Sequence, residues 1–155
     1  MSAVAIGKVV KDFALPSTAG KDFRLSEARG KPLVLYFYPR DNTPGCTLEA
    51  QDYQRLLPAF RRAGVRVCGI SRDTLAAHQK FCDQFGLGFE LLVDEQGRAC
   101  ALFDVIHEKN MYGRKVLGVV RSTFLIDSAG KLRQEWRKVK VTGHAAEVLE
   151  AAKAL

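Results

Sequence analysis

The sequence predicts an α/β fold in which a mixed central sheet is flanked by helices. A continuous apolar and aromatic run at residues 32–38 (PLVLYFY) is typical of a strand that is buried on both faces. After this run, helical and strand patterns alternate, as they do in right-handed βαβ units on a parallel sheet. Late in the chain, two strand patterns separated by Ser128-Ala129-Gly130 predict an antiparallel hairpin.

The segment after the first strand has the pattern of a helix. Its apolar residues recur near helical spacing over residues 47–63, and Gly64 follows, where a helix C-cap favours glycine. Residues 65–71 (VRVCGIS) are a second β-rich run. A strand, a helix and a second strand in this order predict the first βαβ unit.

Another helix is expected near the middle of the chain. Either Asp73 or Thr74 can cap its N-terminus, and we expect it to run through Phe85 and to end at Gly86. The remaining expected elements are a strand at 89–93, a helix at 96–103, a polar loop at 107–118, strands at 122–127 and 131–139, and a helix at 144–154. The order of these elements is typical of a thioredoxin-like fold.

Length and composition indicate a single domain over residues 1–155. Splitting 155 residues would leave two small, poorly buried halves, and no internal repeat or low-complexity linker divides the chain. No apolar run approaches the ~20 residues of a membrane helix, and the first residues lack the pattern of a signal peptide. We therefore expect no membrane association and a cytoplasmic location.

The net charge of +7 raises the question of nucleic-acid binding. The 24 Lys and Arg residues, however, are scattered along the chain and interleaved with 17 acidic residues. The densest cluster, at residues 133–140, alternates with apolar residues as the exposed face of a strand does. We expect a solvated surface here and no nucleic-acid partner.

Four cysteines occur in a chain without an export signal, which favours catalytic, metal-binding or buried roles over a structural disulfide framework. The sequence has no Cys-x-x-Cys pair, and its three histidines lie far from any ligand spacing. We therefore expect neither a metal nor another cofactor. Cys68 lies in a β-rich run and Cys100 in an apolar stretch, and both are expected to be buried and inert.

Residues 39–46 (PRDNTPGC) carry the chemistry, because they lie between the first strand and its helix, where parallel sheets bind ligands. Thr43 is a candidate N-cap, and Pro44 then takes the first helical position. Cys46 falls in the first turn, where the positive end of the helix dipole stabilises a thiolate. The Thr43 hydroxyl is close enough to donate to the sulfur or to an incoming oxygen, and Gly45 lets a small ligand approach the backbone.

Two alternatives stay open at this site. A lone cysteine in the first turn of a helix is often a buried residue that only fills space, whereas the cap, the proline and the glycine together favour an exposed, activated thiol. Glu49 can close a capping arrangement at the helix start, or it can orient Arg40 or Arg121. For Glu49 the structural role is the favoured interpretation.

The pattern Pro39-x-x-x-Thr43-x-x-Cys46 resembles the active-site signature of peroxiredoxins. The wider LYFYPRDNTPGCTLEA resembles the branch known as peroxiredoxin Q, or bacterioferritin comigratory protein. The similarity continues through GIS, KNMYGRKVLGVVRSTFLID and EWRKVKVTGHAAEVL, and an early DFALPSTAGKDFRLSE also matches. The resemblance therefore covers essentially the whole chain.

This resemblance implies a thiol-dependent peroxidase that reduces hydrogen peroxide and organic hydroperoxides. Cys46 would be the peroxidatic cysteine, which attacks the peroxide and becomes a sulfenic acid. Thr43 would bind the peroxide through a hydrogen bond, and Pro39 would shield the sulfur from solvent. Arg121, in the RSTF segment, would supply a fixed positive charge to the thiolate and to the oxygen that leaves.

The resemblance also bears on the cysteine that resolves the sulfenic acid. Many members of the branch carry it five residues after the first, where this chain has Gln51; others carry it in the next helix, which matches Cys82. Two alternatives are that Cys82 is a core residue and that an external thiol resolves Cys46. Cys82 lies about 13 Å along its helix at ~1.5 Å per residue, and a disulfide needs Cα atoms within about 7 Å. An intramolecular Cys46–Cys82 bond is thus expected to require local unwinding.

The resemblance suggests thioredoxin as the reductant, with glutaredoxin as the alternative, and relatives in this branch are often monomers. We expect a monomer, because an intramolecular disulfide would let one chain complete the cycle. A thioredoxin-type disulfide reductase would need the Cys-x-x-Cys that is missing after Cys46. A non-catalytic binding module would leave the Thr43–Cys46 pattern unexplained.

Overall fold

A mixed five-stranded sheet lies at the centre of the computed structural model, which describes residues 4–155. Its strands are β3 (Leu33–Phe37), β4 (Arg66–Ser71), β5 (Glu90–Val93), β8 (Ser122–Ile126) and β9 (Leu132–Arg137). They follow the order β5-β4-β3-β8-β9. β3, β4 and β5 are parallel, whereas the β3–β8 and β8–β9 pairs are antiparallel. The predicted α/β fold with a mixed sheet is confirmed.

β3 is the central strand, and every one of its residues is buried. Its pairing places Leu35 opposite Cys68 of β4 on one side and opposite Phe124 of β8 on the other. Both faces of the sheet are covered, so side chains that point in either direction are apolar or aromatic. This is why the strand is a continuous apolar run in the sequence and does not alternate.

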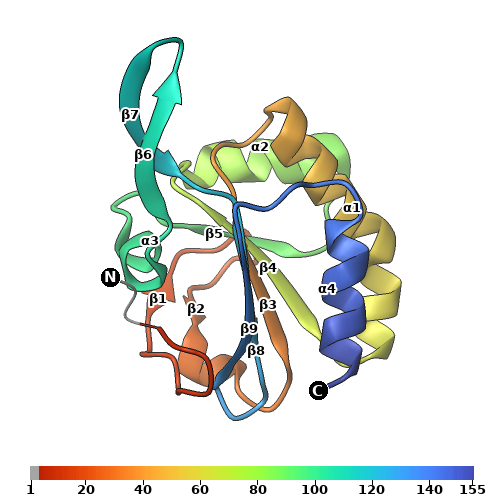
Figure 1. Ribbon diagram of the computed structural model, residues 1–155. Helices are drawn as coiled ribbons and strands as arrows, with labels where there is room; N and C mark the ends of the chain where they lie inside the picture. Colours follow the sequence, from red (N-terminus) through yellow and green to blue (C-terminus); the bar gives the residue numbers. More distant parts are fainter. Residues whose placement is uncertain (1–3) are drawn as a thin grey trace.

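Helices cover the sheet on both faces. They are α1 (Pro44–Arg62), α2 (Leu75–Phe85), α3 (Arg98–Phe103), α4 (His144–Lys153) and the 3-10 helix η1 (Leu25–Ala28). α1, α2 and α4 share one apolar cluster with Val34 and Tyr36 of β3, whereas α3 and η1 share the other cluster with Leu35 and Phe37. Figure 1 shows α1 and α4 side by side along one side of the sheet. The site described below lies at the end of β3 where α1 begins.

The helix ends agree with the capping residues in the sequence. Thr43 is the N-cap of α1 and Pro44 its first residue. Of the two candidates for α2, Thr74 is the N-cap, and its Oγ1 accepts a hydrogen bond of 3.1 Å from the backbone N–H of Ala77. Gly86 ends α2 in the left-handed conformation, at φ 61°, where glycine carries no steric penalty.

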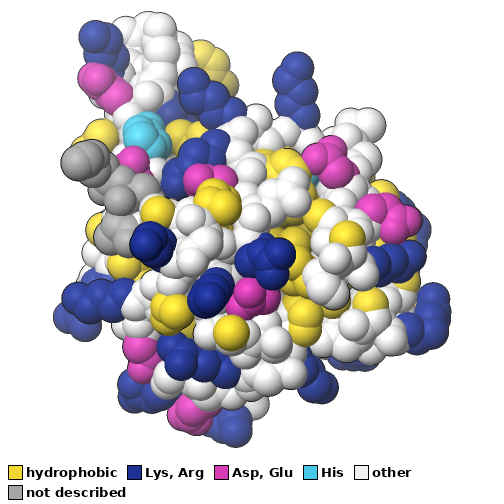
Figure 2. Space-filling model, turned by 60° about the horizontal axis from the view of Figure 1, so that its bottom comes forward, with side chains coloured by type: hydrophobic (Ala, Val, Ile, Leu, Met, Phe, Trp, Pro, Cys, Tyr) yellow, Lys and Arg dark blue, Asp and Glu magenta, His cyan; other side chains and the backbone are white. Residues whose placement is uncertain are grey.

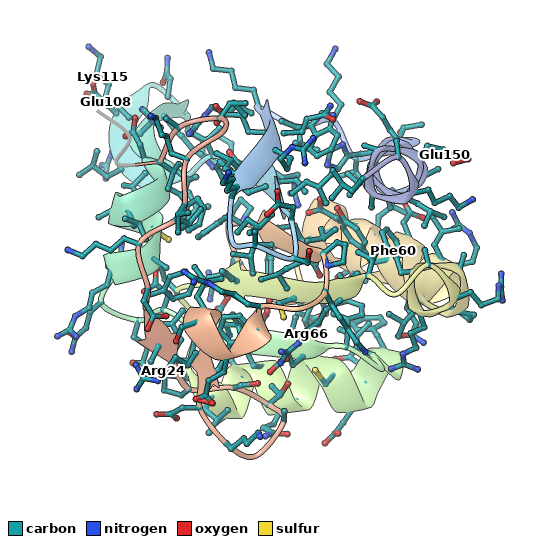
Figure 3. The ribbon with its side chains drawn as sticks, turned by 90° about the horizontal axis from the view of Figure 1, so that it is seen from below. Arg24, Phe60, Arg66, Glu108, Lys115 and Glu150 are labelled. Carbon is teal, nitrogen blue, oxygen red and sulfur yellow. The ribbon has the colours of Figure 1, made fainter. Side chains whose placement is uncertain are left out.

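The prediction of a polar loop at 107–118 is wrong, because this segment is a β-hairpin. β6 (Ile106–Met111) and β7 (Arg114–Val119) pair in antiparallel register around Tyr112 and Gly113, which both have positive φ. The hairpin extends away from the sheet (Figure 1). Figure 3 shows its residues Glu108 and Lys115 on the opposite side of the molecule from Phe60 and Glu150. Most residues of β7 are exposed, so the segment lacks the alternation of buried apolar and exposed polar residues that marks a strand in a sequence.

A second small sheet lies near the N-terminus. It pairs β1 (Ala14–Leu15) with β2 (Phe23–Arg24) in antiparallel register, and both strands contribute to the cluster that contains α3. On the surface, Lys and Arg side chains are scattered over the face shown in Figure 2 and stand next to acidic ones. Among residues 4–155, no helix combines the length and apolar character that crossing a membrane requires.

Candidate active site

The candidate nucleophile, Cys46, is the third residue of α1 and lies directly after the loop that follows β3. Its side chain is buried, with 2 % of its surface exposed, so the expectation of an exposed thiol is wrong. It packs in the same cluster as Tyr36 and Tyr53, which close the site from the sheet and helix side. The sulfur nevertheless lies at the positive end of the α1 dipole.

Arg121 meets the sulfur from the junction between β7 and β8. Its Nη2 donates to Sγ of Cys46 at 3.4 Å, and its Nη1 donates to Oε1 of Glu49 at 2.7 Å. A Cβ at Gly45 would lie 3.1 Å from the same Nη2. Gly45 therefore makes room for the guanidinium. From the sequence, we expected Gly45 only to let a small ligand approach the backbone. The structure thus brings together residues that are 75 positions apart in the sequence.

Glu49 anchors this guanidinium and does not cap the helix, so the favoured capping role is wrong. Its side chain is buried, and its Oε1 accepts from Arg121 while Oε2 has no hydrogen-bond partner among residues 4–155. Burial raises the pKa of Glu49 to about 7, against the opposing effect of the nearby Arg121 charge. The carboxylate therefore changes its charge close to neutral pH.

Thr43 and Pro39 are both partly buried beside the start of α1. The Thr43 hydroxyl donates to the backbone oxygen of Arg40 at 2.9 Å, rather than to the sulfur as the sequence suggested. This bond fixes the hydroxyl at the edge of the loop, with its oxygen free to accept a further hydrogen bond. To donate to a peroxide, the hydroxyl has to rotate away from Arg40.

Lys109 of the β6–β7 hairpin is partly buried and interacts electrostatically with Arg121 and Cys46. Burial lowers the pKa of Lys109, and the charge of Arg121 lowers it further. The hairpin, which the sequence pattern did not reveal, therefore adds a second positive charge to the electrostatic surroundings of Cys46. The signal for this residue was present in the resemblance, in the segment that contains both Lys109 and Arg121.

The other three cysteines are free thiols in different surroundings. Cys68 and Cys100 are fully buried, as predicted, and burial raises the pKa of each thiol. Cys82 is half-buried in α2, on a different helix from Cys46, and burial also raises the pKa of its thiol. It lines a pocket together with Thr18 and Phe89.

One polar cluster near the site was not predicted from the sequence. Ligand-type atoms of Asp41, Asp73 and His78 lie within 4.8 Å of one another, a spacing that a metal ion could use. These atoms are, however, already engaged with protein groups. His78 Nδ1 contacts Asp41 Oδ2 at 2.6 Å, and a carboxylate oxygen of Asp73 accepts from the backbone N–H of Asp41 at 2.9 Å. A hydrogen-bonded network explains the cluster without an ion.

Comparison with known proteins shows the family to which the chain belongs. The model of the AhpC/TSA family matches residues 6–135. Peroxiredoxin Bcp of Xanthomonas campestris pv. campestris is 50% identical over 143 residues, which cover 92% of this chain and 89% of that protein. The chain belongs to the AhpC/TSA family of peroxiredoxins. Within that family it falls in the peroxiredoxin Q, or Bcp, branch.

Solved structures of this branch have the same thioredoxin-like fold. PrxQ of Xylella fastidiosa, solved as a mutant, superimposes with a TM-score of 0.93 at 41% identity and covers 99% of this chain and 98% of its own. The bacterioferritin comigratory protein of Xanthomonas campestris, studied for its alkyl peroxide reduction activity, has a TM-score of 0.90 at 45% identity with the same coverage. As a peroxiredoxin, the chain is a peroxidase that reduces peroxides with electrons from a thiol.

Proposed function

We propose that Cys46 is the peroxidatic cysteine of this peroxiredoxin and that it reduces hydrogen peroxide and organic hydroperoxides. The observation that carries the proposal is the contact of 3.4 Å between Arg121 Nη2 and Cys46 Sγ, with Arg121 held by Glu49. A fixed guanidinium beside the sulfur favours the thiolate and stabilises negative charge that develops next to it. The alkyl peroxide activity of the Xanthomonas relative supports the inclusion of organic hydroperoxides.

The first step transfers one oxygen atom to sulfur. The Cys46 thiolate attacks the terminal oxygen of the peroxide, the O–O bond breaks, and the remaining alkoxide or hydroxide takes up a proton and leaves. Cys46 is then a sulfenic acid. Arg121 stabilises the leaving oxygen, the Thr43 hydroxyl binds the peroxide after it rotates from Arg40, and Pro39 limits access of water to the sulfur.

In the second step, we assign Cys82 as the resolving cysteine. Its sulfur attacks the Cys46 sulfur, a disulfide forms, and the oxygen leaves as water. Cys82 is the candidate because Cys68 and Cys100 are fully buried, whereas Cys82 is half-buried and lies at a helix surface beside a pocket. Cys46 is buried in α1 and Cys82 lies in α2, so the attack requires local unwinding of one or both segments.

Peptide-resolved mass spectrometry tests both assignments. One equivalent of hydrogen peroxide is added to the reduced protein, and the cysteine peptides are then identified. We expect a Cys46–Cys82 disulfide in the unchanged protein, sulfenic or sulfinic Cys46 in Cys82→Ser, and no peroxide consumption by Cys46→Ser. Oxidised Cys46 beside a free Cys82 thiol in the unchanged protein would leave resolution to an external thiol, and an unmodified Cys46 would contradict the whole proposal.

The proposed reductant is thioredoxin, acting in the cytoplasm on a monomeric enzyme. A dithiol protein reduces an intramolecular disulfide by exchange through a mixed disulfide, which fits the Cys46–Cys82 bond. Peroxide consumption coupled to thioredoxin and its reductase should greatly exceed consumption coupled to glutaredoxin and glutathione. The reverse ratio would assign glutaredoxin. Sedimentation of the reduced and oxidised protein measures the oligomeric state.

A further inference from the structure

A buried polar pair joins the loop before Cys46 to the helix that carries Cys82. Asp41 belongs to the loop between β3 and α1, and His78 lies in the first half of α2. The side chain of His78 is fully buried and that of Asp41 is 5% exposed. Their contact, between Nδ1 and Oδ2 at 2.6 Å, is not used by the peroxide chemistry described above. Burying two polar side chains costs desolvation free energy, so the pair is expected to serve a purpose other than filling the core.

The hydrogen bonds around the pair show that it holds a proton. His78 Nε2 lies 2.9 Å from the backbone oxygen of Leu92, which only accepts, so Nε2 carries a hydrogen. Asp41 Oδ1 accepts from the Tyr38 hydroxyl at 2.6 Å. A second proton must then lie between Nδ1 and Oδ2, because two lone pairs would repel at this distance. The contact is therefore a charge-assisted or strongly polar bond, and every polar atom of the pair is satisfied.

A second bond ties the same loop to the start of α2. The backbone N–H of Asp41 donates to Oδ2 of Asp73 at 2.9 Å, and this oxygen also accepts from the hydroxyl of Ser71. Asp73 directly precedes Thr74, the N-cap of α2. Asp41 thus holds α2 at its N-terminus through the backbone and one turn further on through His78.

Cys82 lies one helical turn after His78, four residues along α2, so both side chains share a face of the helix. Burial raises the pKa of the Cys82 thiol, and the charge of Asp41 acts in the same direction, so Asp41 and the proposed resolving thiol interact electrostatically. At the other end, Asp41 is five residues before Cys46. The pair therefore lies between the two segments that must rearrange for a disulfide to form.

We propose that Asp41 and His78 are positioning residues that hold the active-site loop and α2 together, and that this pair must separate before Cys82 can reach Cys46. The proposal rests on the assignment of Cys82 as the resolving cysteine. Separation of the pair sets how long the Cys46 sulfenic acid persists. It thereby sets the balance between the disulfide and the further oxidation of Cys46 to sulfinic acid when peroxide is abundant.

Asp41→Asn and His78→Leu distinguish this role from a purely structural one. In Asp41→Asn, the amide N–H can donate to Nδ1 of a neutral His78 and the amide oxygen can accept from Tyr38, so the contact stays closed. His78→Leu removes both bonds of the imidazole and leaves Asp41 without its partner. His78→Gln is the alternative to His78→Leu, because its amide can keep the bond to Leu92 and has no donor at the Nδ1 position.

The rate of disulfide formation is measured by acid quench and mass spectrometry after one equivalent of hydrogen peroxide. We expect His78→Leu and His78→Gln to form the Cys46–Cys82 disulfide about ten- to a hundredfold faster, the effect of losing one hydrogen bond to a charged group. The sulfinic fraction at high peroxide should fall in parallel. Asp41→Asn, which keeps the contact as a weaker neutral hydrogen bond, should accelerate disulfide formation clearly less than either His78 variant.

Asp94→Asn is the matched control. Asp94 is another buried carboxylate, but it accepts from the backbone N–H groups of Ala99 and Cys100 at the start of α3. This variant should lose stability without faster disulfide formation. Equal acceleration in Asp94→Asn and His78→Leu would overturn the proposal, because the effect would then follow stability alone. An unchanged rate in both His78 variants would overturn it as well.

Hydrogen exchange of the reduced proteins tests the pair independently of Cys82. In His78→Leu, the backbone amides of residues 41–46 and of α2 should exchange faster together, and in Asp41→Asn this increase should be clearly smaller. If the unchanged protein formed no Cys46–Cys82 disulfide, the assignment of Cys82 as the resolving cysteine would be wrong. If faster exchange in His78→Leu were confined to α2, the coupling between α2 and the active-site loop would be contradicted. A rise in thermal midpoint with Zn²⁺ that is lost in His78→Leu would show a metal site and overturn the proposal.

Discussion

At the scale of single residues, the proposed reactivity of Cys46 depends on a carboxylate that acts through Arg121. Glu49 accepts from Nη1 of Arg121 at 2.7 Å, and Nη2 of the same guanidinium donates to the sulfur at 3.4 Å. Burial of Glu49 is costly, and its pairing with Arg121 offsets part of that cost. Because burial raises the pKa of Glu49 to about 7, the anchor of Arg121 is uncharged in mild acid and charged above neutral pH.

Glu49→Gln keeps the shape of this anchor and removes its charge. We expect peroxide reduction to slow by about tenfold or more, since a hydrogen bond to a charged group contributes about 1.5–3 kcal/mol. In the unchanged enzyme, Glu49 ionises as the pH rises through about 7, so the rate of sulfenic acid formation should rise there. This rise in rate near pH 7 should be missing in Glu49→Gln. Peroxide consumption from pH 5 to 9 measures both effects, and identical pH profiles would contradict the role of Glu49.

Gly45→Ala tests how closely Arg121 must approach. The added Cβ would lie 3.1 Å from Nη2, which is tighter than ordinary contact, so the guanidinium has to shift away from the sulfur. We expect a loss of peroxidase rate with little change in thermal midpoint, because Gly45 lies in a helix where alanine is favourable. Gly118→Ala is the control, since its Cβ would meet Lys109 at an ordinary 3.4 Å. A normal rate in Gly45→Ala would show that Arg121 tolerates displacement.

At the scale of elements, two helices begin with threonine but use it differently. Thr74 Oγ1 accepts from the N–H of Ala77 and so caps α2. Thr43 occupies the N-cap position of α1 without a side-chain cap bond, because its hydroxyl donates to Arg40. An N-cap that gives up its usual hydrogen bond is available for another task. At α1 we propose that this task is binding the peroxide.

Thr43→Ala and Thr74→Ala should therefore impair different properties: Thr43→Ala mainly the rate of peroxide reduction, and Thr74→Ala mainly the stability of the protein. We expect Thr74→Ala to lower the free energy of unfolding by about 1 kcal/mol, the usual value of an N-cap. Thr43→Ala should lower stability less and slow peroxide reduction more. Urea unfolding and peroxide consumption on both variants make the comparison. A larger loss of stability in Thr43→Ala than in Thr74→Ala would mean that the hydroxyl serves the helix.

The elements also show which parts of the fold are predictable from sequence. β3, α1, β4 and α2 were predicted within a few residues, because apolar periodicity, Pro44, Gly64 and Gly86 mark them locally. The β6–β7 hairpin was missed, since most of β7 is exposed and no buried face imposes alternation. Its turn is also unmarked, because Tyr112 takes a positive φ where asparagine or aspartate is more usual.

The site was predictable in part, where its residues lie close together in the sequence. Thr43 and Cys46 stand in one short segment, so spacing alone placed them on the first turn of α1. Arg121 depended on the resemblance, because its approach to the sulfur results from the pairing of β8 with β3. Glu49 and His78 could not be assigned, since a charged residue within a helical pattern does not show whether it faces solvent or a buried partner.

At the scale of the whole molecule, helices cover both faces of the sheet, and Cys46 and Cys82 are free thiols on two different helices, α1 and α2. Cys46 lies in the cluster that α1, α2 and α4 form over one face of the sheet, and Phe81, next to Cys82, is buried in the same cluster. A Cys46–Cys82 disulfide therefore cannot form without removing part of this cluster from its packing. The catalytic cycle would then alternate between a well-packed reduced state and a less packed oxidised state.

Oxidation should consequently not raise the thermal midpoint. A disulfide that closes a loop of this size would by itself add about 4 kcal/mol through chain entropy. Separating the Asp41–His78 pair costs about 1.5–3 kcal/mol, and exposing Phe81 costs about 1.5–3 kcal/mol more, so these losses offset the gain. Calorimetry of the reduced protein and of the disulfide form, with peroxide-treated Cys82→Ser as control, measures the difference. A higher midpoint after oxidation, with unchanged hydrogen exchange in α2, would mean that the bond forms between intact helices.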